Sequence, residues 1–181
     1  TINNYIGQPT YYGGSGDIVQ TGNRGQQYAK SPGAIVDIPV FSPDIDNNEI
    51  SKIIELIIKH KVEGIIISNT TDSNRENLSD IQKNEKGGLS GQPLKDLSTN
   101  LIKKFFKETK GKIQIIGVGG VDSGQTAFEK ISAGANAVQL YTGMVYKGPG
   151  LVKGMKKELI SILKKENIKN ISQAVGINTW P

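Results

Sequence analysis

The most informative segment of the sequence is Ile113–Gly143, IQIIGVGGVDSGQTAFEKISAGANAVQLYTG. It begins with a short β-branched run, Ile113–Gly117, which is typical of a buried parallel strand. A segment with apolar residues at helical spacing follows and ends at Gly134. A second apolar run, Ala137–Leu140, completes a strand–helix–strand unit. Because parallel strands need such a crossover, the segment predicts a parallel α/β sheet.

Small or polar residues follow both strands directly. Gly119 and Gly120 come after the first strand, and Tyr141, Thr142 and Gly143 come after the second. Ligands of parallel α/β folds bind at these carboxyl ends, where glycine N–H groups and the first turn of the next helix can hold a phosphate. We predict one phosphate between the two turns; the alternative is that the glycines only make tight turns.

The residues before this segment predict two further strands and a helix. Ile38–Phe41 predicts a short strand and Gly64–Ile67 a buried one. Between them, Asp46 and Glu49 have the spacing of a capping box, which predicts a helix that begins at Asp46. Its apolar positions share one face: Ile50, Ile53, Ile54, Ile57 and Ile58. His60 lies at the end of this helix and off that face, so we interpret it as a surface residue.

A long polar segment, Asp72–Leu97, lacks any apolar period. Such loops in compact domains are usually functional lids or disordered, and both interpretations stay open here. Ser98 predicts the N-cap of the next helix, which has an apolar face of Leu101, Ile102, Phe105 and Phe106. A last helix is expected at about Gly150–Lys165, followed by a short closing turn at Ile171–Val175; its inward residues are Leu151, Val152, Met155, Leu159, Ile162 and Leu163.

This order of strands and helices is that of consecutive βα units in a TIM-type (β/α) barrel. A complete barrel takes eight units and about 250 residues, whereas this chain of 181 residues has about four units. We therefore expect an α/β domain at residues 38–181 that forms part of a barrel. Residues 1–37 are rich in Gly, Tyr and Gln and show neither period, so we expect an irregular arm there.

The composition excludes several classes of protein. Apolar residues make up 36% and charged residues 22% of the chain, as in folded globular proteins. The absence of cysteine excludes disulfides and thiolate metal sites, and the single histidine excludes a His-rich metal site, so we predict no metal. We also expect neither a secretory signal nor a membrane-spanning segment, because no apolar run is long enough.

The net charge of +5 and the pI of about 9.3 raise the question of nucleic-acid binding. The lysines concentrate at solvent-facing positions of predicted helices: Lys103, Lys104, Lys107, Lys153, Lys156, Lys157, Lys164 and Lys165. Aromatic residues do not alternate with them, as they would in a surface that stacks on bases. We therefore expect a solvated helix surface and no nucleic-acid partner.

Short motifs follow one another along residues 42–178. They are SPD at Ser42–Asp44, SNTT at Ser68–Thr71, GGLSGQPL at Gly87–Leu94, IIGVGGV at Ile115–Val121, AVQLYTG at Ala137–Gly143 and GPGLVKGMKKEL at Gly148–Leu159. Together they resemble the C-terminal half of the quinone-dependent (class 2) dihydroorotate dehydrogenases. The resemblance implies that the chain contains the C-terminal four or so βα units of a TIM barrel. We find no resemblance in the N-terminal arm.

The resemblance implies FMN-dependent oxidation of dihydroorotate to orotate in pyrimidine biosynthesis, with quinone as the electron acceptor. It implies contacts of Asn69 and Thr70 with dihydroorotate or orotate, because an amide supplies both the donor and the acceptor that a pyrimidine edge requires. It also implies cofactor-binding roles for Ser68, Ser90, Gly91, Val118, Gly119, Gly120, Leu140, Tyr141 and Thr142. By family, the expected location is the cytoplasmic face of the inner membrane; a chain without an anchor would be cytoplasmic.

Two features of that family are missing from the sequence. The serine base of the family lies in a motif like NxSSPNT, which does not occur here, and the lysine two residues before SPD is replaced by Val40. We therefore name no catalytic residue and expect no oxidation of dihydroorotate by this chain alone. The alternatives are a non-catalytic half-barrel that binds flavin or phosphate, and another FMN barrel enzyme that acts on RNA. Self-association would cover the open edge of a half-barrel.

Overall fold

The computed structural model describes residues 38–73, 75–76 and 78–179, so the predicted arm at residues 1–37 lies outside the described part. Within it, a four-stranded sheet consists of β1 (Val40–Phe41), β2 (Gly64–Ile67), β3 (Gln114–Gly117) and β4 (Ala137–Val138). The strands are parallel and hydrogen-bonded in chain order, β1-β2-β3-β4. This confirms the predicted parallel α/β fold, with consecutive strands side by side as in part of a barrel.

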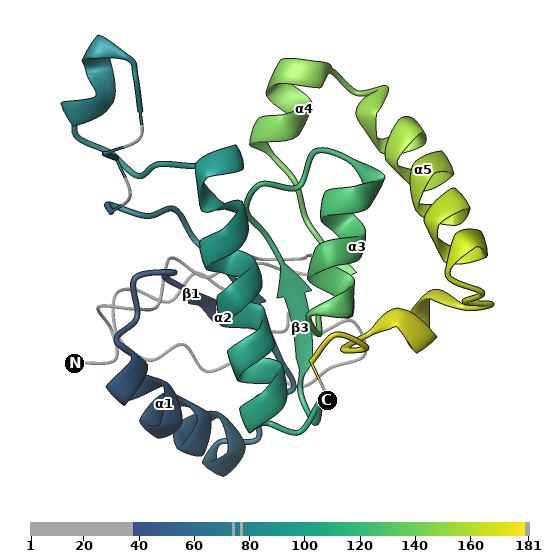
Figure 1. Ribbon diagram of the computed structural model, residues 1–181. Coiled ribbons are helices and arrows are strands. Elements are labelled where there is room, and N and C mark those ends of the chain that lie inside the picture. The colour runs from purple at the N-terminus through teal and green to yellow at the C-terminus, as the bar shows by residue number, and fades with distance from the viewer. Residues whose placement is uncertain (1–37, 74, 77, 180–181) are drawn as a thin grey trace, which may run out of the picture.

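Helices alternate with these strands. They are α1 (Asn47–Lys59), α2 (Lys95–Glu108), α3 (Gly124–Ser132), α4 (Thr142–Lys147) and α5 (Leu151–Lys165), with short 3-10 turns η2 (Ile81–Asn84), η3 (Gln92–Leu94) and η4 (Ile171–Ala174). In Figure 1, β3 is seen between α2 and α3, α5 packs outside α3, and α4 lies beyond the carboxyl end of β3. The segment between β2 and α2 projects from the same end of the sheet.

The core forms where the strands meet α1 and α2. Ile65, Ile67 and Ile115 of the sheet are fully buried, and the rings of Phe41 and Phe105 lie 5.5 Å apart. The predicted apolar face of α2 is buried throughout, and so are Ile50, Ile53, Ile54 and Ile57 of α1. Ile58 is 57% exposed, contrary to prediction, because at 100° per residue it lies about 80° away from Ile50 around the helix.

The predicted helix starts are only partly confirmed. Asp46 is the N-cap of α1, and its carboxylate accepts from the Asn48 N–H at 2.9 Å. The capping box with Glu49 is not formed, since the Asp46 carboxylate accepts from Asn48 instead and Glu49 Oε2 has no hydrogen-bond partner. The N-cap predicted at Ser98 is wrong: α2 begins at Lys95, directly after the 3-10 turn η3, and Ser98 is buried inside it.

The C-terminal part follows the prediction except at α4, where no helix was expected. Its six residues are too few to show an apolar period. In α5, Met155 is buried and the other predicted inward residues are half-buried. Of these, Leu159, Ile162 and Leu163 pack against residues of α3 and η4. The lysines predicted to face solvent are exposed. No helix in the described part of the chain is long and apolar enough to cross a bilayer.

Candidate ligand-binding site

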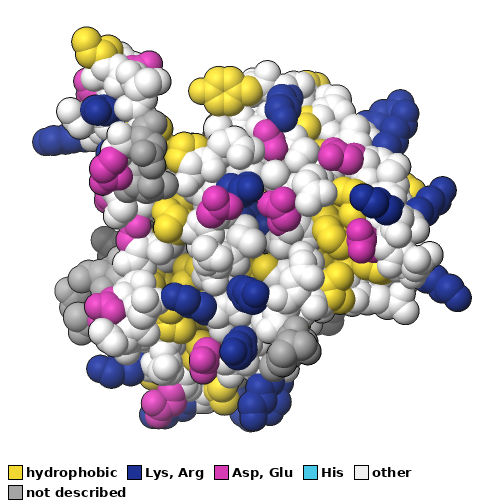
Figure 2. Space-filling view, in the orientation of Figure 1, with side chains coloured by type: hydrophobic (Ala, Val, Ile, Leu, Met, Phe, Trp, Pro, Cys, Tyr) yellow, Lys and Arg dark blue, Asp and Glu magenta, His cyan; other side chains and the backbone are white. Residues whose placement is uncertain are grey.

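A cavity of about 780 Å³ lies at the carboxyl ends of β2, β3 and β4. Four stretches of chain form most of its wall: 68–70 after β2, 88–94 before α2, 118–122 after β3 and 140–143 after β4. Figure 2 shows the surface notched between the projecting segment and the body of the protein. This is the end of a parallel sheet at which ligands bind in α/β folds.

All residues to which the sequence analysis gave a binding role line this cavity. They are Ser68, Asn69, Thr70, Ser90, Gly91, Val118, Gly119, Gly120, Leu140, Tyr141 and Thr142. Residues far apart in the chain meet there, since Ser90 Oγ and Thr142 Oγ1 lie 3.0 Å from each other. The strand-end motifs therefore form a single site.

Two features require glycine at positions 119 and 120: a positive φ angle and the close approach of α2. Its φ angles are 102° and 69°, a region that other residues rarely adopt. A Cβ on Gly119 would lie 3.0 Å from the Leu94 side chain and 3.2 Å from Ser98 Cβ, and one on Gly120 would lie 2.5 Å from Lys95 Cβ. The missing side chains therefore make room for α2.

Backbone donors at the cavity come from loops and from the first turn of α4, which contributes Thr142 and Gly143 to the wall. Helix α3 does not supply them as predicted, because its Gly124 N–H donates to Glu158 Oε2 at 2.7 Å and its Thr126 N–H to Ser123 Oγ at 3.1 Å. Among the described residues, the N–H groups of Gly119 and Gly120 have no protein acceptor. They are therefore available to a ligand.

Ser68 lines the cavity with a hydroxyl that lacks a partner. Its side chain is buried, at 4% exposure, and Ser68 Oγ has no hydrogen bond within the described structure. Such a group costs about 1–3 kcal/mol of stability, so a ligand that bonds to it gains affinity. Asn69 and Thr70 are exposed beside it, and Asn69 Oδ1 accepts from the Thr70 N–H at 2.8 Å.

An ion pair at the rim was not predicted. Lys147 Nζ of α4 donates to Asp122 Oδ2 at 2.8 Å and to the Asp122 carbonyl at 3.1 Å. Partial burial raises the pKa of Asp122, but hydrogen bonds from Lys147 and Gln92 outweigh it, so this pKa lies below its ordinary value. The two residues are 25 positions apart on different elements, which no local pattern connects. The pair fixes α4 to the turn after β3.

Two residues named in the sequence analysis lie away from the cavity. His60 is exposed at the end of α1, as predicted, and is not part of the cavity wall. Val40, at the position of the missing lysine, is buried in β1 and does not line the cavity either. Neither residue is placed to serve a ligand there.

A family model described as dihydroorotate dehydrogenase matches residues 14–163. The match begins within the Gly-rich segment, so the expectation that the whole arm lies outside the resemblance is wrong. A quinone-type dihydroorotate dehydrogenase of Trichodesmium erythraeum is 45% identical over 147 residues, which are 76% of this chain and 38% of the relative. A mitochondrial one of Mus musculus is 42% identical over 149 residues, 82% of this chain and 37% of the relative.

A solved structure shows the same fold. The crystal structure of ligand-free dihydroorotate dehydrogenase from Eimeria tenella superposes with a TM-score of 0.76 at 38% identity. The superposition covers 78% of this chain and 39% of that one. The chain thus spans well under half the length of the relatives that it matches.

Proposed function

The chain belongs to the dihydroorotate dehydrogenase family, and from this premise we propose that its cavity binds FMN. One observation carries the proposal: the family motifs converge on a single cavity whose buried Ser68 hydroxyl has no partner. The N–H groups of Gly119 and Gly120, which also lack acceptors among the described residues, suit the phosphate end of FMN. The residues present therefore fit this cofactor.

We assign the two ends of the cofactor to different stretches of the wall. The phosphate is held by Gly119 and Gly120, together with Tyr141 and Thr142. The flavin ring lies against the remaining cofactor residues, Ser68, Ser90, Gly91, Val118 and Leu140. When bound, FMN supplies a hydride acceptor. The protein residues bind and orient it and keep water from the buried side of the site.

Dihydroorotate or orotate is the proposed second ligand. Asn69 and Thr70 present an amide and a hydroxyl beside Ser68, which match the donors and acceptors of a pyrimidine edge. Oxidation of dihydroorotate with quinone as acceptor, and peripheral attachment to a membrane, belong to the complete enzymes of this family. For this chain we propose binding without turnover, because the motif that carries the serine base is not in the sequence.

Fluorescence titration with FMN and with riboflavin, which lacks the phosphate, tests the proposal. We expect FMN to bind at least about tenfold more tightly, equivalent to about 1.4 kcal/mol. Equal affinities for the two flavins would refute a phosphate site at the glycine turn.

The variant Ser68→Ala tests the ring end of the same site. Removing a buried hydroxyl without a partner should raise the unfolding free energy of the ligand-free protein by about 1 kcal/mol. The same change should weaken FMN binding, because the ligand loses a hydrogen bond. An affinity that stays unchanged, whatever happens to stability, would show that the hydroxyl does not face the cofactor.

A further inference from the structure

Lys130 is a fully buried lysine on α3 that none of the proposed binding steps uses. Its stem passes behind the end of β3, where a Cβ on Gly117 would lie 3.1 Å from Lys130 Cδ. Gly117 therefore leaves the space through which the lysine reaches α2. A long cationic side chain is almost never fully buried unless it has a specific partner.

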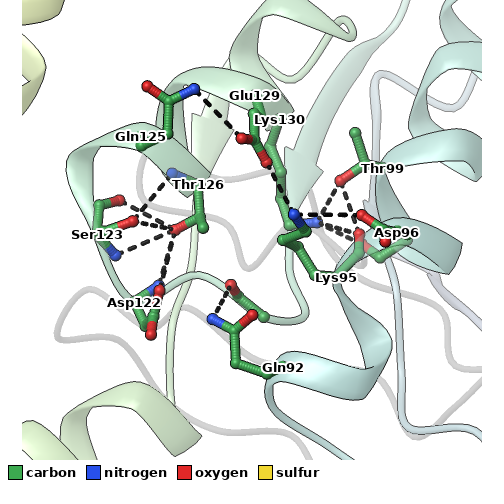
Figure 3. Close-up of polar contacts among 12 residues, drawn as sticks. Gln92, Lys95, Asp96, Thr99, Asp122, Ser123, Gln125, Thr126, Glu129 and Lys130 are labelled. Atoms are coloured by element: carbon green, nitrogen blue, oxygen red, sulfur yellow. Dashed lines mark hydrogen bonds and ion pairs between the residues drawn. The ribbon is translucent and has the colours of Figure 1, made fainter.

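The partners of Lys130 are oxygen atoms of the first turns of α2. Lys130 Nζ donates to Ser98 Oγ and Thr99 Oγ1 at 3.0 Å each, and to the Lys95 carbonyl at 3.3 Å (Figure 3). All three acceptors are neutral, and within the described part of the chain the ammonium makes no ion pair. The lysine thus joins α3 to the start of α2.

Two of the three residues that Lys130 holds, Ser98 and Lys95, contact the glycine turn. Ser98 Oγ donates to the carbonyl of Val118, the residue before the turn. Gly119 approaches Leu94 and Ser98, and Gly120 approaches the backbone of Lys95. A shift of the first turn of α2 would therefore move the turn and its N–H groups.

We propose that Lys130 is the positioning residue of the anion-binding turn. Its ammonium fixes the start of α2 and, through Ser98, the Val118 carbonyl, so that the N–H groups of Gly119 and Gly120 keep the arrangement that binds a phosphate. It also places a positive charge behind that turn. The proposal deepens the proposed function, because the phosphate ligand is taken from it.

The charges around Lys130 come from its own helix and from α2. Burial lowers the pKa of Lys130 to about 8; Glu129 and Asp96 raise it, and Lys95 lowers it further. Lys95 forms ion pairs with Asp96 at 3.4 Å and with Glu129 at 3.5 Å, so those carboxylates are already engaged. Lys130 should therefore lose its proton within an accessible pH range. The acid next to the turn, Asp122, titrates far below that range because its pKa is lowered.

Three variants separate positioning from general packing. Lys130→Met keeps the length of the side chain and removes the charge. Ser98→Ala and Thr99→Val each remove one hydroxyl that accepts from Lys130 at 3.0 Å, but only Ser98 is also bonded to Val118. Thr99→Val is therefore the matched control for Ser98→Ala.

The first measurement follows the backbone amide resonances of Gly119 and Gly120 in the full, ligand-free chain between pH 6.5 and 9.5. In the wild type they should shift with a midpoint near the Lys130 pKa of about 8. The pH dependence should vanish in Lys130→Met and persist in Thr99→Val. Ser98→Ala should move both resonances more than Thr99→Val does. If Lys130 only filled space, its loss of a proton would not shift the amide resonances of Gly119 and Gly120.

The second measurement is the affinity for FMN at pH 7. Lys130→Met should bind about tenfold more weakly, the size of one charge-assisted hydrogen bond, and Thr99→Val should stay within about twofold of the wild type. Wild-type resonances that do not titrate, or equal effects of Ser98→Ala and Thr99→Val, would overturn the proposal. If Lys130→Met does not fold, the comparison of Ser98→Ala with Thr99→Val tests whether the Lys130 contacts position the turn. A wild type that binds FMN no better than riboflavin would refute the proposed function alone, since the resonances are measured without ligand.

Discussion

At the scale of single residues, Lys130 should make protein stability depend on pH. Its pKa is about 8 in the folded protein and 10.5 as the ordinary value, so between these values the unfolded chain binds more protons. Stability then rises with pH in that window, by up to about 1.4 kcal/mol per pH unit. In urea titrations, the unfolding free energy of wild type minus that of Lys130→Met should increase from about pH 8 to 10.

An exposed lysine provides the control for this measurement. Lys157 lies on the outer surface of α5, so Lys157→Met should change stability by less than about 0.5 kcal/mol and add no slope in this window. If wild type and Lys130→Met had the same pH slope, Lys130 would not be the titrating group that its burial indicates.

A second residue-scale prediction concerns Gly119→Val. The φ of 102° and the contacts with Leu94 and Ser98 leave no room for a branched side chain. We expect a loss of about 1–3 kcal/mol of stability from the backbone alone, and a loss of FMN retention because the turn must move. Visible absorption of the purified protein measures the flavin occupancy.

A glycine elsewhere serves as its control. Gly154 lies exposed in α5 with nothing within 4 Å of an added Cβ, so Gly154→Ala should raise stability by about 1 kcal/mol and leave FMN binding unchanged. Full flavin occupancy in Gly119→Val would contradict the role of this turn.

The glycine pair also shows how far residue types alone can be interpreted. A glycine signals either a special φ or a close neighbour, and both occur here, but the sequence does not say whether the neighbour is a ligand or a helix. The contact of Ser98 with Lys130 joins positions 32 apart on two helices. Such long-range polar contacts leave no periodic pattern in the sequence, so the role of Lys130 could not be predicted from it.

At the scale of elements, the described residues 83–87 of the segment between β2 and α2 are gathered around Arg75. Its guanidinium donates to the carbonyls of Lys83 and Glu85 at 3.0 Å each, and also to that of Gly87. Thr71 and Leu89 close the base of the segment by exchanging backbone hydrogen bonds of 3.1 and 2.7 Å. The turn η2 within it has no buried residue. Hydrogen bonds between the Arg75 side chain and backbone carbonyls thus hold this part of the segment together, in place of buried apolar side chains.

Limited proteolysis should therefore cut first within residues 72–86, because local opening costs least where few apolar contacts exist. Arg75→Ala should speed this cleavage by about tenfold, since several charge-assisted hydrogen bonds disappear together. Arg75→Lys keeps the charge but lacks the planar fork of donors, so it should give an intermediate rate. Mass spectrometry of the first fragments identifies the site. Initial cleavage inside α1, α2 or α5 would show that this segment is as stable as the helices.

The predicted elements were right where apolar periodicity is strong. The β-branched runs at β2 and β3 and the apolar faces of α1 and α2 follow directly from the sequence. The start of α2 was missed because no side chain caps it; the turn containing Pro93 leads straight into the helix. The predicted binding residues were identified because they directly follow strands that the sequence predicts. The Lys147–Asp122 ion pair was not, because it depends on the unpredicted helix α4 and on a tertiary contact.

At the scale of the whole molecule, the described strands form an open sheet with β1 and β4 at its edges. In a complete barrel those edges would be hydrogen-bonded to further strands. Pairing of two copies remains our proposal for covering them, and sedimentation at several protein concentrations tests it. Both edge strands are only two residues long, which limits the number of backbone groups that such pairing must satisfy.

The last prediction is that this chain does not oxidise dihydroorotate at a useful rate, even with FMN bound. A positioned base is typically worth about 10²–10⁴-fold in rate, and the family motif that carries it is not among the 181 residues. The resemblance implies a lysine near the reduced flavin at the position where this chain has Val40. The positive charge of that lysine is therefore missing too. Pairing two copies would restore neither group, since each copy lacks both.

Anaerobic mixing of the FMN-loaded protein with dihydroorotate measures this directly as bleaching of the flavin absorption. Dithionite serves as the control, because it should reduce the bound flavin and show that the cofactor is competent. We expect slow or no bleaching by dihydroorotate. Rapid bleaching would mean that a residue of the cavity replaces the missing base, and Ser68, with its unpartnered hydroxyl, would be the first to test. Ser68→Ala would then abolish the reaction with dihydroorotate while leaving the reaction with dithionite intact.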